Sequence, residues 1–395
     1  MADIMVDIMT PAGTGPSKQA LKQQADKQRI VRLFRGAYID AEEYTALDTA
    51  GRYRAQARAF LATHPKLQAW GLTAAALEGA PVLSGAPLHF SGNRSNAKSM
   101  QKGCVFHETL PAVPAVNNRT AQILFECATT SPLPDALMAA NHLLKSLSAN
   151  ATGGLTASRD LDEKTSEALI WSQLDSKNER VKESSIVDAG KLDVNKPGFL
   201  ESYSATRLTE FSSPEAELAW FDFAQLCVAY RTRRAIPKAL RAGSYFTDQI
   251  DSPAESLLIA RCAELGFAIP YLQVNILDPV SGRHLGRVDG LWPSSKVLKG
   301  LYLKDSSFGR FLFIKQRGDS ESIVIEFDGR MKYQQDYFET LDKERIRQNS
   351  IGNLGFRFVR IGWSDLMQPE QLHSILAEAK VPRSRRNSRR SLNHS

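Results

Sequence analysis

Cysteine is scarce in this chain of 395 residues, and the few that occur lie far apart. They are Cys104, Cys127, Cys227 and Cys262, and none forms a Cys-x-x-Cys pair or has the spacing to histidine that a zinc site needs. The pattern argues against both a structural zinc site and a disulfide framework. We therefore expect buried thiols.

Long apolar runs are missing as well. No stretch approaches the roughly 20 consecutive apolar residues that a membrane-spanning helix requires. The first ten residues alternate acidic and apolar side chains, unlike the basic start and apolar centre of a signal peptide. We therefore expect a cytoplasmic protein. The hydrophobic fraction of 43% suits a globular chain, and the length predicts two or three domains.

Acidic residues are absent from the C-terminal end, residues 381–395, where five arginines stand among serines and asparagines. The formal charge is +7, and without these five it is only +2. Such a segment buries too little apolar area to offset its ordering entropy, so we expect a disordered tail. It is either a flexible arm that attracts phosphates or a solvated terminus. The five are Arg383, Arg385, Arg386, Arg389 and Arg390.

Near the N-terminus, a helix is predicted to begin at Ser17, which precedes a run of good helix formers. Residues 30–39 then alternate apolar and basic side chains around Gly36, which indicates a short hairpin. A winged helix ends with this order of elements. Arg29, Arg32 and Arg35 are therefore candidates for contact with a DNA backbone, although any small hairpin can carry solvated arginines.

The middle of the chain is mainly helical. The basic cluster at Arg231, Arg233, Arg234 and Lys238 suits either nucleic acid or a solvated face. The isolated His107 and His142 are assigned no chemistry. The predicted segments are a disordered start with a winged-helix-like domain, a mixed α/β region, a polar linker or insertion, connecting helices, an α/β domain and the basic tail. Their bounds are 1–48, 49–149, 150–214, 215–249, 250–380 and 381–395.

The last large domain begins with a capping box. Ser252 is the N-cap, Pro253 the first helical residue and Glu255 the N3 acid, and Gly266 ends the predicted helix. Strands are predicted at 272–277, 284–292, 322–327 and 355–363, with helices at 341–353 and 369–379. Residues 294–320 interrupt the series. Helix, strands, helix, strand, helix predicts an α/β sandwich around a mixed sheet.

Three carboxylates fall on two of these strands. Asp289 lies near the end of one, and Glu326 and Asp328, two residues apart, point to the same face of another. Acids gathered this closely need a cation, and oxygen ligands select Mg²⁺ or Mn²⁺. Both aspartates precede glycine and also suit ordinary turns. A turn does not explain Glu326, because burying a carboxylate inside an apolar strand costs several kcal/mol without a partner.

The residues also carry a resemblance, over about 250–378, to the endonuclease-like domain related to very-short-patch repair endonucleases, within the PD-(D/E)xK superfamily. The residues that match, in order, are Ser252-x-x-Glu255, Val288-Asp289, Glu326-x-Asp328-Gly329-x-x-Lys332-Tyr333, Glu344-x-x-Arg347, Gly355-Phe356 and Val359-Arg360-x-x-Trp363. Residues 17–147 resemble AbiEi-type abortive-infection antitoxins, through the hairpin motif Arg35-Gly36-Ala37-Tyr38.

The resemblance implies a restriction-endonuclease-like α/β/α sandwich in which Asp289 and Glu326 bind metal and Asp328 supports them. It also implies a catalytic contribution from Glu255, for which the capping box is an equal explanation. Asp328 stands where the superfamily has its catalytic lysine, and Lys332 stands where the repair enzymes usually have histidine. Lys332, Arg347 and Arg360 are candidate nucleic-acid contacts. Glu344 and Arg347 also suit an exposed ion pair, and Arg360 a place at the sheet edge.

These observations predict a DNA-binding protein with a Mg²⁺-dependent endonuclease domain that hydrolyses phosphodiester bonds. The metal would activate water and stabilise the charge of the attacked phosphate, with Lys332 orienting water or neutralising that charge. The alternative is an antitoxin-like transcriptional regulator, or a DNA-binding protein with an inactive nuclease fold. Its partners would be a promoter operator or a cognate toxin.

Overall fold

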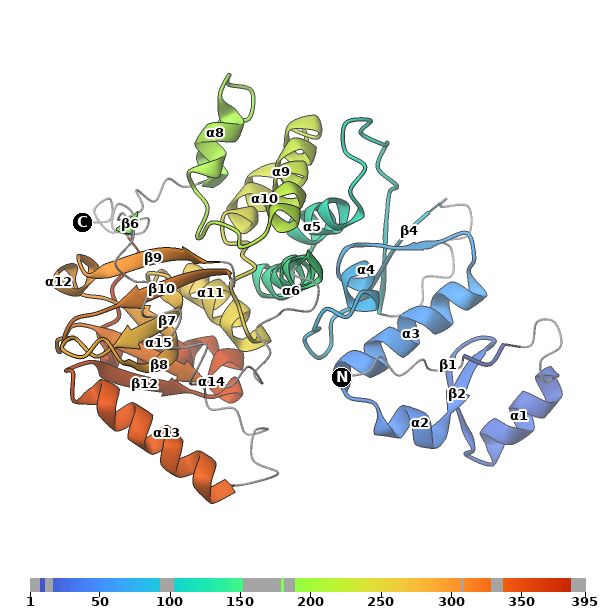
Figure 1. Cartoon of the computed structure of the whole chain (residues 1–395). Helices are drawn as coiled ribbons and strands as arrows, with labels where there is room; N and C mark the ends of the chain where they lie inside the picture. Colours follow the sequence, from blue (N-terminus) through green and yellow to red (C-terminus); the bar gives the residue numbers. More distant parts are fainter. Residues whose placement is uncertain are drawn as a thin grey trace, which may run out of the picture. The chain divides into compact units, whose positions relative to one another are not determined.

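The computed structural model divides into two compact units, which are described separately (Figure 1). The N-terminal unit comprises Met1–Leu144, Gly190–Glu201 and Leu218–Phe246, and the C-terminal unit comprises Lys145–Ala189, Ser202–Glu217 and Thr247–Ser395. The described residues are 8–10, 17–92, 103–151, 179–180, 189–306, 309–327 and 337–384. They form a mixed α/β structure, and no helix in these ranges has the length and apolar character to span a membrane.

The N-terminal unit begins with the elements that the sequence predicts. Helix α1 (Lys18–Asp26) is capped by Ser17, whose side chain accepts a hydrogen bond from the Ala20 N–H at 3.2 Å. Strands β1 (Ile30–Phe34) and β2 (Ala37–Asp40) form an antiparallel hairpin. Gly36 lies in its turn with a φ of +84°, a conformation that favours glycine. The predicted helix and hairpin are therefore confirmed.

The rest of this unit packs helices against a three-stranded sheet. Its strand order is β3-β4-β5, with β3 antiparallel and β5 parallel to β4. The strands are β3 (Gln68–Ala69), β4 (Leu88–Ser91) and β5 (Cys104–His107). The first helices are α2 (Ala41–Ala46), α3 (Thr49–Thr63), α4 (Gly71–Leu77) and α5 (Arg119–Thr130), followed by α6 (Leu133–Ala151), α9 (Pro214–Ala229) and α10 (Ile236–Gly243). Phe60, Leu72, Phe90 and Ile123 lie in the core, which explains the predicted helical spacing of apolar residues.

The C-terminal unit is built on a seven-stranded mixed sheet with the order β12-β11-β8-β7-β10-β9-β6. Strands β7, β8 and β11 are antiparallel neighbours, whereas β11–β12 and β7–β10 are parallel pairs. The strands are β6 (Glu179–Arg180), β7 (Tyr271–Leu277), β8 (His284–Trp292), β9 (Leu301–Ser306), β10 (Gly309–Ile314), β11 (Ile323–Phe327) and β12 (Arg357–Ile361). The predicted strands therefore meet in one sheet.

Residues 294–320 do more than interrupt this sheet. After the short helix α12 (Ser295–Leu298), strands β9 and β10 pair with each other, and β10 joins β7 in parallel. The lysines and arginines of this segment obscured its strand pattern, but Leu301, Phe313 and Ile314 are buried. The segment thus extends the sheet.

The long helices of this unit are α11 (Pro253–Leu265), α13 (Tyr337–Gly352) and α15 (Pro369–Glu378), and the short ones are α8 (Phe199–Ser204), η2 (Ala189–Lys191) and α14 (Trp363–Met367). Part of α8, together with η2, extends into the ranges of the N-terminal unit. Helices α11, α14 and α15 contact one another, whereas α13 packs on β8 (Figure 1). The Ser252 side chain caps α11, and Gly266 ends it with a φ of +77°, as predicted.

The basic tail begins later than predicted. Val381 is buried, and the Arg383 guanidinium lies 3.9 Å from the centre of the Phe267 ring. Arg383 also donates a hydrogen bond to the Leu265 carbonyl at 3.2 Å. These contacts compensate the ordering cost of residues 381–384. The remaining tail lies outside the described residues.

Candidate functional site

Two of the predicted acidic residues lie on neighbouring antiparallel strands. The register pairs Ile325 with Gly290, so the next residues along β11 and β8 are Glu326 and Asp289. The Asp289 side chain accepts a hydrogen bond from the Phe327 N–H at 2.9 Å through Oδ2. It therefore ties the inner part of β8 to the last residue of β11.

Glu326 is buried, with 6% of its surface exposed, and it has strong partners on α13. Its Oε1 accepts from Nη2 of Arg347 at 2.6 Å, and its Oε2 accepts from Nε2 of Gln348 at 3.0 Å. A buried carboxylate is tolerated when it has an opposite charge and hydrogen-bond donors. The sequence prediction that Glu326 needs a partner is thus met by two consecutive helix residues.

Arg347 is fixed by more than this ion pair. Its Nη1 donates to the carbonyl of Arg287 at 2.8 Å. Its aliphatic stem crosses Gly286, where an added Cβ would lie 2.7 Å from both Cγ and Cδ of Arg347. The guanidinium thus points from α13 to two different strands. The sequence predicted an ion pair between Arg347 and Glu344, but the side chain of Glu344 lies outside the described atoms.

Arg360 joins the same cluster from β12. It stands beside Glu326 in the parallel register of β11 and β12, and its guanidinium donates to Oε1 of Gln348. Gln348 therefore links Arg360 to Glu326. Sequence reasoning missed Gln348, because an amide on a polar helix face carries no signal of its own.

Glu255 lies at the start of α11 and has 1% of its surface exposed. Burial raises the pKa of Glu255 to about 7, and the charge of Asp289 adds to this shift. Its carboxyl group accepts from the Asp251 N–H at 3.1 Å, the Ser252 hydroxyl at 2.8 Å and Nε2 of Gln273 at 2.7 Å. The predicted capping box is therefore met in part, because Ser252 caps α11 but the Glu255 carboxyl group accepts from the N–H of the preceding residue, Asp251. Glu255 is also an electrostatic neighbour of Asp289.

Gln273 has an unusual backbone for a strand residue. Its φ is +53°, in the left-handed region that non-glycine residues seldom adopt, although it lies within β7. Such strain persists only where surrounding contacts hold it, and it is frequent at functional sites. Nothing in the sequence distinguishes Gln273, since glycine or asparagine would be the usual signal for this conformation.

The described residues do not by themselves complete a divalent metal site. Among them, no group of three or more histidine, cysteine, aspartate or glutamate side chains could hold a metal ion. Glu326 is already bonded to Arg347 and Gln348. Asp328 and Lys332, which the sequence placed in the same site, lie outside the described residues.

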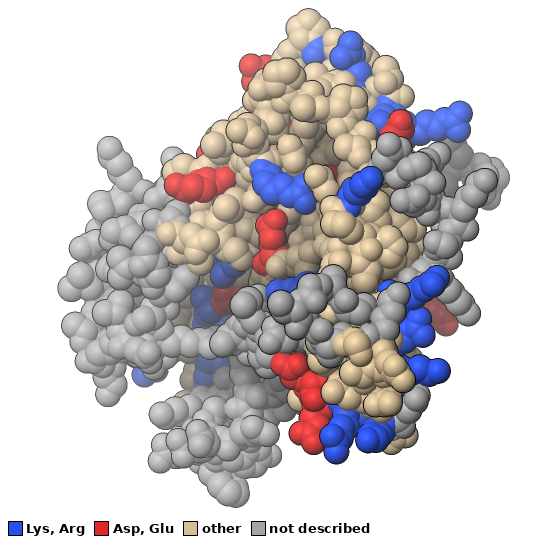
Figure 2. All heavy atoms as spheres, turned by 90° about the vertical axis from the view of Figure 1, so that its right-hand side faces the viewer, with Lys and Arg blue, Asp and Glu red and all other residues tan. Residues whose placement is uncertain are grey.

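The arginines of the N-terminal hairpin are placed differently. Arg29, Arg32 and Arg35 are all exposed, and within the described part of the chain none forms an ion pair. Nε of Arg32 donates to the Phe34 carbonyl at 3.3 Å. In Figure 2, lysine and arginine side chains gather on the lowest part of the visible face, next to a group of acidic side chains.

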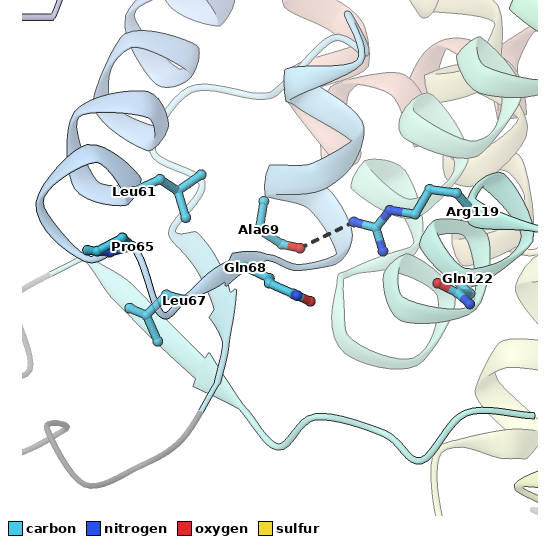
Figure 3. Close-up of a pocket in the computed structure, with 7 residues that line it drawn as sticks. All are labelled: Leu61, Pro65, Leu67, Gln68, Ala69, Arg119 and Gln122. Carbon is cyan, nitrogen blue, oxygen red and sulfur yellow. Dashed lines mark hydrogen bonds between the residues drawn. The ribbon is translucent and has the colours of Figure 1, made fainter.

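The N-terminal unit also has an open groove beside β3 (Figure 3). Arg119 reaches across it, donating to the Ala69 carbonyl at 3.4 Å and lying 3.9 Å from Glu126. Glu126 is buried and caps α4 by accepting from the Gly71 N–H at 2.7 Å, and burial raises its pKa to about 7. The groove is lined by Leu61, Pro65, Leu67, Gln68, Ala69, Arg119 and Gln122.

His107 is less isolated than the sequence indicates. Its Nε2 lies 2.8 Å from Nδ1 of His89, and its ring stacks on Trp70. Burial lowers the pKa of His107, and burial together with the nearby His107 lowers the pKa of His89 to about 4. Both shifts favour the neutral imidazole, and one ring donates to the other. This is a structural pair.

Comparisons with known proteins do not assign the chain to a family. No protein-family model matches it, and searches of curated proteins and of solved structures find no similar protein.

Proposed function

We propose that this chain is a DNA-binding protein that contacts the phosphate backbone through Arg29, Arg32 and Arg35. The observation that carries the proposal is the exposure of these three guanidinium groups on one short hairpin directly after α1. Arginines that hold no carboxylate keep their charge for phosphate oxygens. The order of helix and hairpin supports a winged-helix type of domain, in which the hairpin is the wing.

The test is the affinity of the full chain for a fluorescent 20-base-pair duplex, measured by anisotropy at 0.1 M salt. We expect the variant Arg29→Ala/Arg32→Ala/Arg35→Ala to bind at least tenfold more weakly than the wild type. The matched control is Arg231→Ala/Arg233→Ala/Arg234→Ala, which removes the same charge from three exposed residues after α9. Equal losses of DNA affinity in both variants would show that only the net charge matters, and would contradict the proposed hairpin contact.

For the C-terminal unit we propose a restriction-endonuclease-like sandwich. The support is the order of its elements: α11, the antiparallel strands β7, β8 and β11, then α13 and the parallel strand β12. Glu255, Asp289 and Glu326 come from α11, β8 and β11. Asp289 and Glu326 follow one another in the register of β8 and β11, and Asp289 is an electrostatic neighbour of Glu255. The further strands β9, β10 and β6 extend the sheet beyond β7.

A Mg²⁺-dependent endonuclease is the second candidate function, favoured by the electrostatic contact between Glu255 and Asp289. The described carboxylates do not fit a metal ion without rearrangement, so no hydrolytic step is derived from them. The Glu326–Arg347 pair instead favours a nuclease-like fold that binds DNA without cleaving it, as a transcriptional regulator or antitoxin would. Its partners would then be an operator or a cognate toxin.

Incubation of the full chain with supercoiled plasmid and Mg²⁺ or Mn²⁺ separates these two functions. The variant Asp289→Ala/Glu326→Ala serves as the control. The non-hydrolytic function predicts intact plasmid with both proteins. Nicking by the wild type that requires the metal and is lost in the variant would establish the endonuclease instead.

A further inference from the structure

The buried carboxylate of Glu326 has a cationic partner supplied by the chain itself. The side chain of Glu326 is 8% exposed and that of Arg347 is 22% exposed, so water screens the pair only weakly. The contact between Oε1 and Nη2 is 2.6 Å, and Nε2 of Gln348 reaches Oε2. Arg347 thus supplies the compensating charge for Glu326, and Arg347 and Gln348 together supply its hydrogen bonds.

The position of Arg347 is set by three independent contacts. Besides the carboxylate, the guanidinium holds the Arg287 carbonyl, and the stem lies over Gly286. Any larger residue at position 286 would place a carbon 2.7 Å from this stem. A planar guanidinium can donate to two acceptors in a fixed geometry, which the single ammonium group of lysine cannot reproduce.

A second arginine reinforces the arrangement. Arg360 donates to Oε1 of Gln348, while Nε2 of the same amide donates to Glu326. The amide of Gln348 is therefore oriented, because its oxygen faces a cation and its nitrogen faces an anion. Two strands and one helix are joined through one buried carboxylate.

We propose that Arg347 is the built-in counter-cation of Glu326 and takes the role that a divalent metal ion would have at this carboxylate. A metal could bind Glu326 only if the guanidinium moved away. Glu326 therefore does not contribute to the binding of Mn²⁺ by the wild-type protein, whether or not the chain binds DNA.

The test is a titration of the full chain with Mn²⁺ alone, followed by electron paramagnetic resonance of the free ion. We expect the Mn²⁺ affinities of the wild type and Glu326→Gln to agree within twofold. Arg347→Met should bind Mn²⁺ at least fivefold more tightly, because the Glu326 carboxylate is released from its ion pair. The gain should vanish in Arg347→Met/Glu326→Gln. A tenfold loss of affinity in Glu326→Gln, or no gain in a folded Arg347→Met, overturns the proposal.

Thermal unfolding followed by circular dichroism supplies a second readout that needs no metal. Arg347→Met leaves a buried carboxylate without its cation, so we expect a melting temperature lower by roughly 6–12 °C. The double variant removes both charges and should recover at least half of this loss. If Arg347→Met does not fold, the double variant still must; failure of both to fold, or no recovery in the double variant, overturns the proposal. Arg347→Lys should recover only part of the stability, since its single nitrogen cannot take the place of both Nη1 and Nη2 of the guanidinium.

Discussion

The arginines of the N-terminal hairpin and Arg347 of the C-terminal unit are the same residue type in opposite settings. Arg29, Arg32 and Arg35 are exposed, and within the described residues they hold no carboxylate. Arg347 is largely buried and holds Glu326. Solvated guanidinium groups remain available to a ligand, whereas a desolvated guanidinium belongs to the fold. The hairpin arginines therefore form a surface that can bind phosphate, whereas the charge of Arg347 is already neutralised by Glu326.

The largest effect that we expect from a single titrating group is the pH dependence of stability caused by Glu255 in the C-terminal unit. The pKa of Glu255 is about 7 in the folded chain and near 4.5 when unfolded. A raised pKa means that the stabilisation is complete below pH 4.5 and is lost as the pH rises through 7. We expect the wild type to lose about 2.5 kcal/mol of unfolding free energy between pH 5 and pH 8 from this residue.

The measurement is urea unfolding of wild type and Glu255→Gln at both pH values. The difference between the proteins isolates Glu255 from other titrating groups, including Glu126 in the N-terminal unit. A parallel pH dependence in the two proteins would show that Glu255 keeps an ordinary pKa.

The next effect tests how tightly Arg347 is placed. Gly286→Ala would put a carbon 2.7 Å from the Arg347 stem at a backbone φ of +158°, which strains a residue with a side chain, so we expect overpacking and backbone strain together to cost about 2 kcal/mol. The control is Gly352→Ala at the end of α13, where the nearest contact is 4.0 Å from the new carbon. Equal stability of the two variants in urea would contradict the observed path of the side chain.

Arg360 is intermediate between the hairpin arginines and Arg347, because it is exposed but bonded to Gln348. An exposed side chain contributes little through such a contact, so Arg360→Ala should lower stability by about 0.5–1 kcal/mol. Arg347→Ala should cost several times more. Chemical denaturation of both variants ranks the two arginines, and a reversed ranking would contradict the assigned burial.

The smallest effect on stability is expected at the hairpin itself. Arg35→Ala removes an exposed side chain and should change the unfolding free energy by less than about 0.5 kcal/mol. Urea denaturation of the full chain, followed by circular dichroism, checks this for Arg35→Ala against the wild type. A larger loss of unfolding free energy would mean that Arg35 stabilises the folded chain, as Arg347 does, and would contradict the difference between the two.

Local signals in the sequence predicted much of this structure. Ser252 and Gly266 fixed the ends of α11, Ser17 fixed the start of α1, and Gly36 fixed the hairpin turn, because each acts on its own backbone. The need of Glu326 for a partner was also predictable, since a carboxylate inside an apolar strand cannot stay alone.

The partner itself could not be predicted. The helical spacing indicated Glu344 for Arg347, and that pair stays a prediction, whereas the contact of Arg347 with Glu326 arises from the packing of α13 on β8. This contact depends on how distant elements pack. The left-handed backbone of Gln273 and the strands β9 and β10 were missed for the same reason: tertiary contacts override the preferences of their residues.

The salt dependence of DNA affinity tests most directly the claim that the exposed arginines recognise phosphate. Each phosphate contact contributes about 0.9 to the slope of log affinity against log salt concentration. For Arg29→Ala/Arg32→Ala/Arg35→Ala, we expect a slope smaller in magnitude by about 2–3 than that of the wild type. An unchanged slope would contradict it.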